Sequence, residues 1–245
     1  MANENSTTLF LLDIEGTTTP IDFVYKTLFP YVREHLESFL STHWEEEAVQ
    51  RDLKQVARDM KAFAREEGAP ALDAQALTLK DVLEALRWQM DHDKKCPGLK
   101  SLQGKIWQAG YIEGTLEGEV YEDVLVLLEK ISNDVNLSAC IYSSGSVQAQ
   151  KLLFKHSKHG DLTAHLSGYY DTLTGPKKEA QSYRAIARAE GVDLEQVLFL
   201  TDNIDEARAA RDAGIGRVVL SVRPGNAPLP EGHGFEEVTR FDKLI

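Results

Sequence analysis

Two hydrophobic patterns divide the chain. Between about Thr27 and Tyr111, apolar residues recur every three or four positions, which predicts amphipathic helices. One predicted helix carries Val49, Leu53, Val56, Met60 and Phe63 on a single face. We expect it to end at Gly68, because glycine readily adopts the left-handed conformation that closes many helices. A second helix should start at Thr78, whose hydroxyl can cap it, and a third should surround Leu99, Leu102 and Ile106.

From Tyr121 onward the pattern changes to alternating helices and strands. Helices are predicted in YEDVLVLLEKI, VQAQKLLFKH, EAQSYRAIARAEG and DEARAARDAG, and strands in NLSACIYSSG, QVLFLTDN and GRVVLSV. Such alternation is typical of an α/β fold in which a doubly wound, mostly parallel sheet has helices on both faces.

One further strand is predicted at the start of the chain, where the apolar run Leu9 to Leu12 precedes turn residues. The simplest topology brings this strand into the same sheet. Residues 1–19 and 119–245 would then form one α/β core domain, and residues 20–118 an inserted helical cap domain, a lid over the strand ends.

Composition excludes several classes of partner. The formal net charge of −12 argues against binding nucleic acid or an anionic membrane through the general surface, since both require a basic face. No segment has the length and hydrophobicity of a signal peptide or membrane span, so we expect a cytoplasmic protein. Cys96 and Cys140 form no metal or redox pair, and buried free thiols are expected.

Two acids follow the first predicted strand directly. Asp13 and Glu15 are two positions apart, so their carboxylates point the same way if the extended geometry persists. Ligands of parallel sheets bind beyond the carboxyl ends of the strands. Two carboxylates so close repel each other, unless a cation lies between them or one is protonated. A solvated turn is the alternative interpretation of this stretch.

Polar residues also follow other predicted strands. Ser143 and Ser144 precede a glycine and a helix, which together can bind phosphate, although such serines are often only helix caps. Asp202 ends the strand of LFLTDN. Lys177 and Lys178 stand at a helix start, where the helix dipole disfavours a cation, although a solvated loop would explain them too. The combination in this order indicates a phosphate-handling site.

These residues resemble the four signature motifs of the haloacid dehalogenase superfamily, which mostly transfers phosphoryl groups through an aspartyl-phosphate. Most phosphatases of that superfamily have Asp where this chain has Glu15. That departure, together with DIEGTTTPIDFV, LFPYV, THWEEE, IYSSGSVQAQKLLF, FLTDN and VRPGNAPL, resembles the enolase-phosphatases (acireductone synthases) of methionine salvage. The resemblance covers nearly the whole chain and is weakest between about Gly68 and Lys95. It implies a haloacid dehalogenase-like Rossmannoid core with an inserted α-helical cap.

The resemblance also implies a reaction. The substrate would be 2,3-diketo-5-methylthiopentyl 1-phosphate, which is enolised and then dephosphorylated to the acireductone, 1,2-dihydroxy-3-keto-5-methylthiopentene. One Mg²⁺ per subunit would be the cofactor, with no organic cofactor. The small phosphorylated diketone would be the partner, with no nucleic acid and no membrane, and the protein would be a monomer.

Residue roles are carried over by position. Asp13 would be the nucleophile and a metal ligand, and Asp202 a second ligand. Glu15 would bind the metal through its carbonyl while its side chain faces the substrate. We expect it to be catalytic as well, because a carboxyl two residues beyond the nucleophile can act as acid and then as base. Lys177 would lie beside the phosphoryl group as a catalytic and substrate-binding residue. Ser143 and Ser144 would bind substrate, with Ser144 and the amide of Gly145 as donors.

Other polar residues receive no firm role. Lys178, Asn203 and Asp205 lie near these motifs, and Asp205 is expected to be a first-turn helix acid or a supporting residue rather than a metal ligand. Arg223 either borders the site or closes the sheet.

Two other functions stay open from the sequence. A generic Mg²⁺-dependent phosphatase acting on another small phosphate ester would share Asp13, Lys177 and Asp202 but would not require Glu15. A non-catalytic binding protein on the same fold is the second alternative, since fold does not decide function. The intact nucleophile argues against it.

Overall fold

The computed structural model describes residues 8–245, which form two compact units. The sheet unit consists of residues 8–25 with Glu117–Ile245, and the helical unit of Lys26–Leu116. Each unit has its own hydrophobic core. No helix of the described residues is long and apolar enough to cross a membrane.

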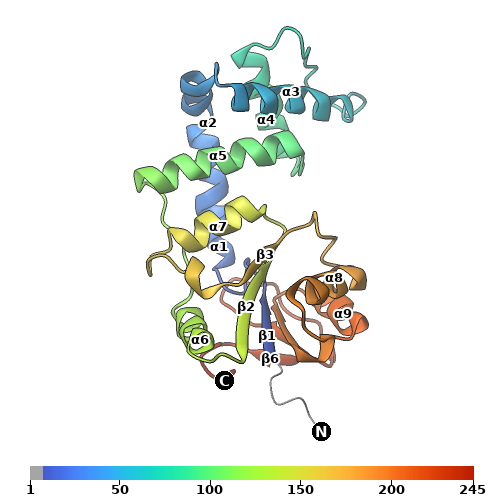
Figure 1. Ribbon diagram of the computed structural model, residues 1–245. Helices are drawn as coiled ribbons and strands as arrows, with labels where there is room; N and C mark the ends of the chain where they lie inside the picture. Colours follow the sequence, from blue (N-terminus) through green and yellow to red (C-terminus); the bar gives the residue numbers. More distant parts are fainter. Residues whose placement is uncertain (1–7) are drawn as a thin grey trace. The chain divides into compact units, whose positions relative to one another are not determined.

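The sheet unit contains a six-stranded sheet in which every neighbouring pair is parallel. Its order is β3-β2-β1-β4-β5-β6 (Figure 1). The strands are β1 (Thr8–Leu12), β2 (Leu137–Tyr142), β3 (Gly168–Tyr170), β4 (Val197–Thr201), β5 (Arg217–Ser221) and β6 (Glu236–Val238). The predicted α/β fold class is thereby confirmed. The short edge strands β3 and β6 were not predicted.

Helices cover both faces of this sheet (Figure 1). They are α6 (Glu122–Ser132), α7 (Val147–Lys155), α8 (Ala180–Glu190) and α9 (Ile204–Ala213). The buried faces of α8 and α9 pack on Leu9, Leu11 and Phe199 of the central strands, while α6 and α7 contact β2 and β3. The central strands are apolar on both faces because helices cover both.

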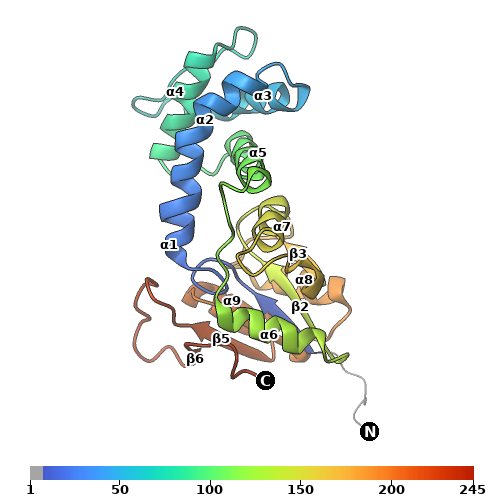
Figure 2. The same cartoon turned by 90° about the vertical axis from the view of Figure 1, so that its left-hand side faces the viewer.

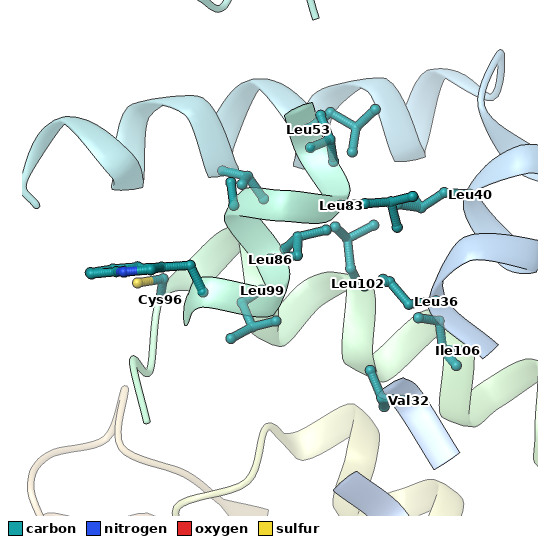
Figure 3. Packing of buried hydrophobic residues seen from close by; sticks show 14 of the residues in the cluster. Val32, Leu36, Leu40, Leu53, Leu83, Leu86, Cys96, Leu99, Leu102 and Ile106 are labelled. Carbon is teal, nitrogen blue, oxygen red and sulfur yellow. The ribbon is translucent and has the colours of Figure 1, made fainter. Parts of the chain in front are cut away.

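The helical unit is built from α2 (Phe29–His43), α3 (Glu47–Lys61), α4 (Leu79–Asp91) and α5 (Pro97–Glu113). A short α1 (Ile21–Phe23) and a π-helical turn (Val24–Leu28) precede α2. Leucines from all four helices meet in one core, with Leu36, Leu53, Leu86 and Leu102 fully buried (Figure 3). The helical spacing seen in the sequence thus corresponds to real buried faces.

Two local predictions have different outcomes. The side chain of Thr78 caps α4 by accepting from the amide of Asp81, as predicted. The predicted end of α3 at Gly68 is wrong, because the helix ends at Lys61. There the amide of Ala62 bonds to the carbonyl of Asp59, three residues back, which tightens and closes the last turn. Phe63 still packs on the core although it lies beyond the helix.

Candidate active site

Three polar strand ends meet at the centre of the sheet. β1 lies between β2 and β4, and Leu12 is in register with both Ile141 and Leu200. Asp13, Ser143 and Asp202 each follow directly on one of these strands. The strand order reverses between β1 and β4, and in open parallel sheets ligands bind at such a point. The topology therefore places the predicted residues where a ligand site is expected.

Lys177 joins two buried carboxylates at this point. Its Nζ lies 2.6 Å from Oδ1 of Asp13 and 2.7 Å from Oε2 of Glu206, and all three side chains are almost fully buried. Burial alone would lower the pKa of Lys177, but the carboxylates of Asp13 and Glu206 outweigh it and raise that pKa well above its ordinary value. Lys177 is therefore a fixed cation beside Asp13.

The backbone around Lys177 is held by three hydroxyl groups. Tyr183 donates to the carbonyl of Lys177 at 2.6 Å, Ser182 to that of Pro176 at 2.8 Å, and Tyr142 to that of Gly175 at 2.9 Å. The loop before α8 is thus locked onto the sheet and the helix. The unfavourable place of this lysine near a helix start is offset by its carboxylate partners.

The two carboxylate oxygens of Asp13 have different hydrogen-bond partners. Oδ1 accepts from Lys177 and, at 2.8 Å, from the amide of Ile14. Oδ2 lies 3.4 Å from the hydroxyl of Thr201, which itself donates to Glu206 at 2.8 Å. Oδ2 is the less engaged oxygen, and it is the one available to an incoming electrophile or cation.

Negative charge accumulates around Asp202. Burial, followed by the charges of Asp13 and Glu206, raises its pKa to about 7; Lys177 opposes the shift and Glu15 adds to it. Burial and Asp13 raise the pKa of Glu206 as well, against the effect of Lys177. The carboxylate cluster (Asp13, Glu15, Asp202 and Glu206) thus has more negative charge than Lys177 alone can balance.

This donor set fits a magnesium ion. Among the described residues, no group of three or more His, Cys, Asp or Glu side chains is arranged to hold a metal. The predicted site needs only two such side chains, Asp13 and Asp202, because its third protein ligand is the carbonyl of Glu15. Mg²⁺ usually keeps several waters and binds through one or two carboxylates and a substrate phosphate. A divalent cation would also balance the carboxylate cluster.

The residues after Asp13 form a tight loop, which we call the Asp13 loop (residues 13–19). The carbonyl of Ile14 accepts from the amides of residues 17–19, and the amide of Gly16 donates to the carbonyl of Thr19. Thr18 also donates its hydroxyl to the carbonyl of Asp13 at 2.9 Å. Gly16 has φ +66°, which a residue with a side chain rarely adopts. The loop therefore turns sharply away from the strand.

The serine pair differs from a simple helix cap. Ser146, rather than Ser143 or Ser144, caps α7. Ser143 is buried and Ser144 exposed, and the amide of Gly145 donates to the hydroxyl of Ser143 at 3.3 Å. Gln150 fixes the turn by donating to the carbonyl of Gly145 at 2.8 Å. Their role as phosphate donors stays a prediction.

Comparison with known proteins assigns the family. The model of the haloacid dehalogenase-like hydrolases matches residues 7–214. The chain is 46% identical to Enolase-phosphatase E1 of Synechococcus elongatus over 238 residues, which cover 95% of this chain and 98% of the relative. It is 44% identical to Enolase-phosphatase E1 of Salmo salar over 250 residues, covering 98% and 95%. The chain belongs to the enolase-phosphatase family. The predicted resemblance and enzyme class are confirmed.

Solved structures agree with this assignment. The UTR4 protein of Saccharomyces cerevisiae is similar with a TM-score of 0.79 and 34% identity, over 98% of this chain and 100% of that one. CbbY of Rhodobacter sphaeroides, with a TM-score of 0.58 and 17% identity, shares the fold. Together with the family match over residues 7–214, this likeness shows a haloacid dehalogenase-like fold.

Glu206 is a site residue that sequence reasoning missed. It stands one helical turn after Asp202, on the face of α9 that buries Ala209, Ala210 and Ala213. An acid on an otherwise apolar face was the available signal, since a buried carboxylate needs a partner. Asn203 accepts from the amides of Asp205 and Glu206 and so caps α9.

Lys178 and Asp205 lie outside the buried cluster. Their exposed side chains pair with each other at 2.9 Å. Asp205 is a first-turn helix acid, in agreement with the sequence-based expectation. Arg223 is buried and paired with Asp123, so it is part of the interior of the sheet unit.

Proposed function

We propose that the protein is an Mg²⁺-dependent enolase-phosphatase of methionine salvage. It enolises 2,3-diketo-5-methylthiopentyl 1-phosphate and hydrolyses the enol phosphate to the acireductone. The observation that carries the proposal is the buried contact between Asp13 and Lys177 at the strand-order reversal, in a chain that matches enolase-phosphatases over nearly its full length. The formal net charge of −12 gives no reason to include nucleic acid as a partner.

The phosphatase half uses Asp13 as nucleophile. Its carboxylate attacks phosphorus, the bond between phosphorus and the enol oxygen breaks, and that oxygen takes a proton. Water then attacks the phosphorus of the aspartyl-phosphate and loses a proton, which returns the carboxylate and releases inorganic phosphate. Lys177 neutralises charge on Asp13 and on the phosphoryl oxygens throughout.

Glu15 carries the protons in this proposal. A carboxyl group two residues beyond the nucleophile can protonate the leaving oxygen and then accept the proton of the attacking water. Enolisation also moves a proton, from a carbon next to a carbonyl to the carbonyl oxygen, and Glu15 is the family-specific group available for it. Asp202 and Asp13, with the carbonyl of Glu15, would hold the Mg²⁺, which lowers the repulsion between the carboxylates and the anionic substrate.

The remaining assignments belong to the same proposal. Ser143 and Ser144 bind the phosphate group, and the helical unit serves as a cap that excludes water during the reaction. The enzyme acts as a cytoplasmic monomer with one Mg²⁺ per subunit.

One assay tests both chemical steps. The purified protein is mixed with the diketone phosphate and Mg²⁺, and ultraviolet absorbance of the enol and release of phosphate are followed in the same sample. We expect an absorbance rise that precedes phosphate release. Asp13→Asn should release no phosphate, because an amide is a poor nucleophile. Phosphate release without enolisation would instead favour the generic phosphatase, and no release at all would refute the phosphatase activity.

A further inference from the structure

Arg223 forms the centre of a buried cluster next to the Asp13 loop. It lies between β5 and β6 in the sequence. Figure 2 shows these two strands and the chain that connects them. Its guanidinium pairs with both oxygens of Asp123, at 3.1 and 2.8 Å, and lies 4.3 Å from the ring centroids of both Tyr121 and Phe241. Arg223 is thus fixed in position by charge pairing and by aromatic contacts.

This fixed arginine reaches the Asp13 loop. Its Nε donates to the carbonyl of Thr17 at 3.3 Å, while Nη1 donates to the carbonyl of Thr239 at 2.8 Å. The amide of Tyr121 also donates, at 3.0 Å, to the carbonyl of Thr18. The guanidinium therefore connects the Asp13 loop to the C-terminal part of the chain.

Asn226 holds the preceding carbonyl of the same loop. Its Nδ2 donates to the carbonyl of Gly16 at 2.8 Å and to that of Ser221 at 3.2 Å. Both groups are acceptors, so the NH₂ half of the amide must face them. Its Oδ1 is buried and has no hydrogen-bond partner among residues 8–245. The geometry thus keeps Asn226 in place although one of its polar atoms is unsatisfied.

Gly16 explains why such support is needed. A Cβ at this position would lie 2.5 Å from Oδ2 of Asp202 and 2.6 Å from Oδ1 of Asn226, so a side chain here would displace both of these side chains as well as strain the backbone. Glycine leaves the backbone free to move, however, and this glycine directly follows Glu15. Hydrogen bonds from outside the loop, to the carbonyls of Gly16 and Thr17, add to those that the loop makes internally.

We propose that Asn226 and Arg223 are positioning residues for Glu15. By holding the carbonyls of Gly16 and Thr17, they fix the backbone that carries the Glu15 carbonyl and side chain beside Asp13 and Asp202. The inference rests on the proposed function, in which Glu15 carries protons. Neither residue touches the reacting atoms, and both act through the Asp13 loop.

A double-mutant cycle between Asn226 and Glu15 tests this role. Asn226→Ala should lower kcat for phosphate release by ~10-fold or more, because a proton carrier that is displaced by a fraction of an ångström transfers protons slowly. KM should change by less than about threefold. In a Glu15→Gln background the same substitution should cost less than about twofold, because there is no proton carrier left to position.

The cycle separates positioning from a merely structural role. Loss of folded protein would reduce kcat by the same factor in both backgrounds, and equal factors would therefore overturn the proposal. Asn133→Ala is the matched control, since this asparagine also donates its amide to a backbone carbonyl, that of Glu129, on an exposed helix end. It should leave kcat unchanged. An unchanged kcat in Asn226→Ala would also overturn the proposal.

Arg223→Lys gives a second measurement. One ammonium group cannot contact both oxygens of Asp123 and the carbonyl of Thr17. We therefore expect Arg223→Lys to lower kcat and to change the pH profile of kcat. Arg217→Lys is its control, because Arg217 makes a paired contact with Glu236 on the sheet surface. Equal kcat in Arg223→Lys and wild type would contradict the role of Arg223.

The failure of this inference can be distinguished from the failure of the proposed function. If the wild-type protein does not turn over the diketone phosphate, the proposed function is refuted. If the wild type turns it over and Asn226→Ala has the same kcat, only this inference is refuted.

Discussion

Lys177 pairs with two buried carboxylates, Asp13 and Glu206, and in the proposed mechanism this sharing affects the reactivity of Asp13. A lysine paired with Asp13 alone would neutralise the nucleophile more fully. Because Glu206 lies 2.7 Å from the same Nζ, part of the positive charge is compensated elsewhere. The position of Asp13, the proposed nucleophile, is fixed by a charge-assisted hydrogen bond from Lys177 at 2.6 Å.

Glu206→Gln should therefore lower activity clearly while it lowers stability only slightly. We expect kcat for phosphate release to fall by ~10-fold, because Lys177 would then pair with Asp13 only. Breaking a buried ion pair commonly costs about 3–5 kcal/mol of unfolding free energy. Here the loss should be within about 1 kcal/mol, because Lys177 keeps Asp13 and the carboxylate cluster loses one repelling charge.

Urea unfolding and phosphate release, measured on the same preparation, check this prediction. Asp205→Asn is the control, because it removes an exposed acid from the same turn of α9. It should change neither quantity appreciably. A loss of more than about 3 kcal/mol in Glu206→Gln would show that Glu206 is mainly a structural partner of Lys177.

Glu15→Gln should separate proton transfer from folding. The amide keeps the size of the side chain and the backbone carbonyl but cannot give or take the proton. We expect phosphate release to slow by ~10²-fold or more, the usual size of a general acid–base contribution. Thermal unfolding and Mg²⁺ affinity should stay close to wild type. Phosphate release within a few-fold of wild type would mean that another group carries the proton.

The residues that the sequence predicts are those next to strong strand signals. Asp13 and Asp202 directly follow apolar runs, so their place at the sheet edge was predictable, and the structure brings both beside Lys177. Arg223 and Asn226 contact the Asp13 loop from 206 and 210 residues away in sequence. Both lie in VRPGNAPL, one of the segments that carry the family resemblance, but their contacts with the Asp13 loop are tertiary, so the sequence alone does not indicate their proposed role.

Edge strands are the elements that hydrophobic patterns miss. β3 and β6 have three residues each, and none of these residues is fully buried. Strands this short and this exposed do not require the run of apolar residues by which the central strands were predicted. Their pairing depends on neighbouring strands and side chains instead. For β6, one such contact is the paired interaction of Glu236 with Arg217 of β5, at 3.0 and 2.7 Å.

Glu236→Gln should weaken this edge slightly and in a pH-dependent way. The hydrogen bond from Arg217 lowers the pKa of Glu236 in the folded state. Its stabilising contribution is therefore complete above the ordinary pKa of glutamate and disappears as the pH falls through the lowered value. Both side chains are nearly half exposed, so we expect a loss of only ~0.2–1 kcal/mol at neutral pH.

Urea titrations from about pH 7 down to about pH 3, which passes well below the ordinary pKa of glutamate, measure this difference between Glu236→Gln and wild type. The two unfolding free energies should converge as the pH falls. If the difference in unfolding free energy between the two proteins stays constant with pH, the carboxylate charge is not the source of the stabilisation.

The charge of the protein makes a closed site important. The formal net charge is −12, and the proposed substrate carries a phosphate group. General electrostatic attraction therefore does not bring substrate to the enzyme. Lys177 and a bound Mg²⁺ are the local positive charges in the proposal, and their effect on phosphate is strongest when water is excluded. The helical unit is the part of the chain proposed to exclude it.

Binding of a phosphate analogue should therefore protect the helical unit. Hydrogen exchange followed by mass spectrometry is compared for the protein alone, with Mg²⁺ alone, and with Mg²⁺ plus orthovanadate. We expect slower exchange in parts of Lys26–Leu116 only in the third sample, because a lid closes over a bound ligand and so requires the phosphoryl analogue in the site. In Asp202→Asn, which lacks one proposed Mg²⁺ ligand, the same addition should leave exchange unchanged. If wild-type exchange in the helical unit is identical in all three samples, although protection appears around Asp13 and Lys177, the analogue binds without closure and the helical unit is not a lid.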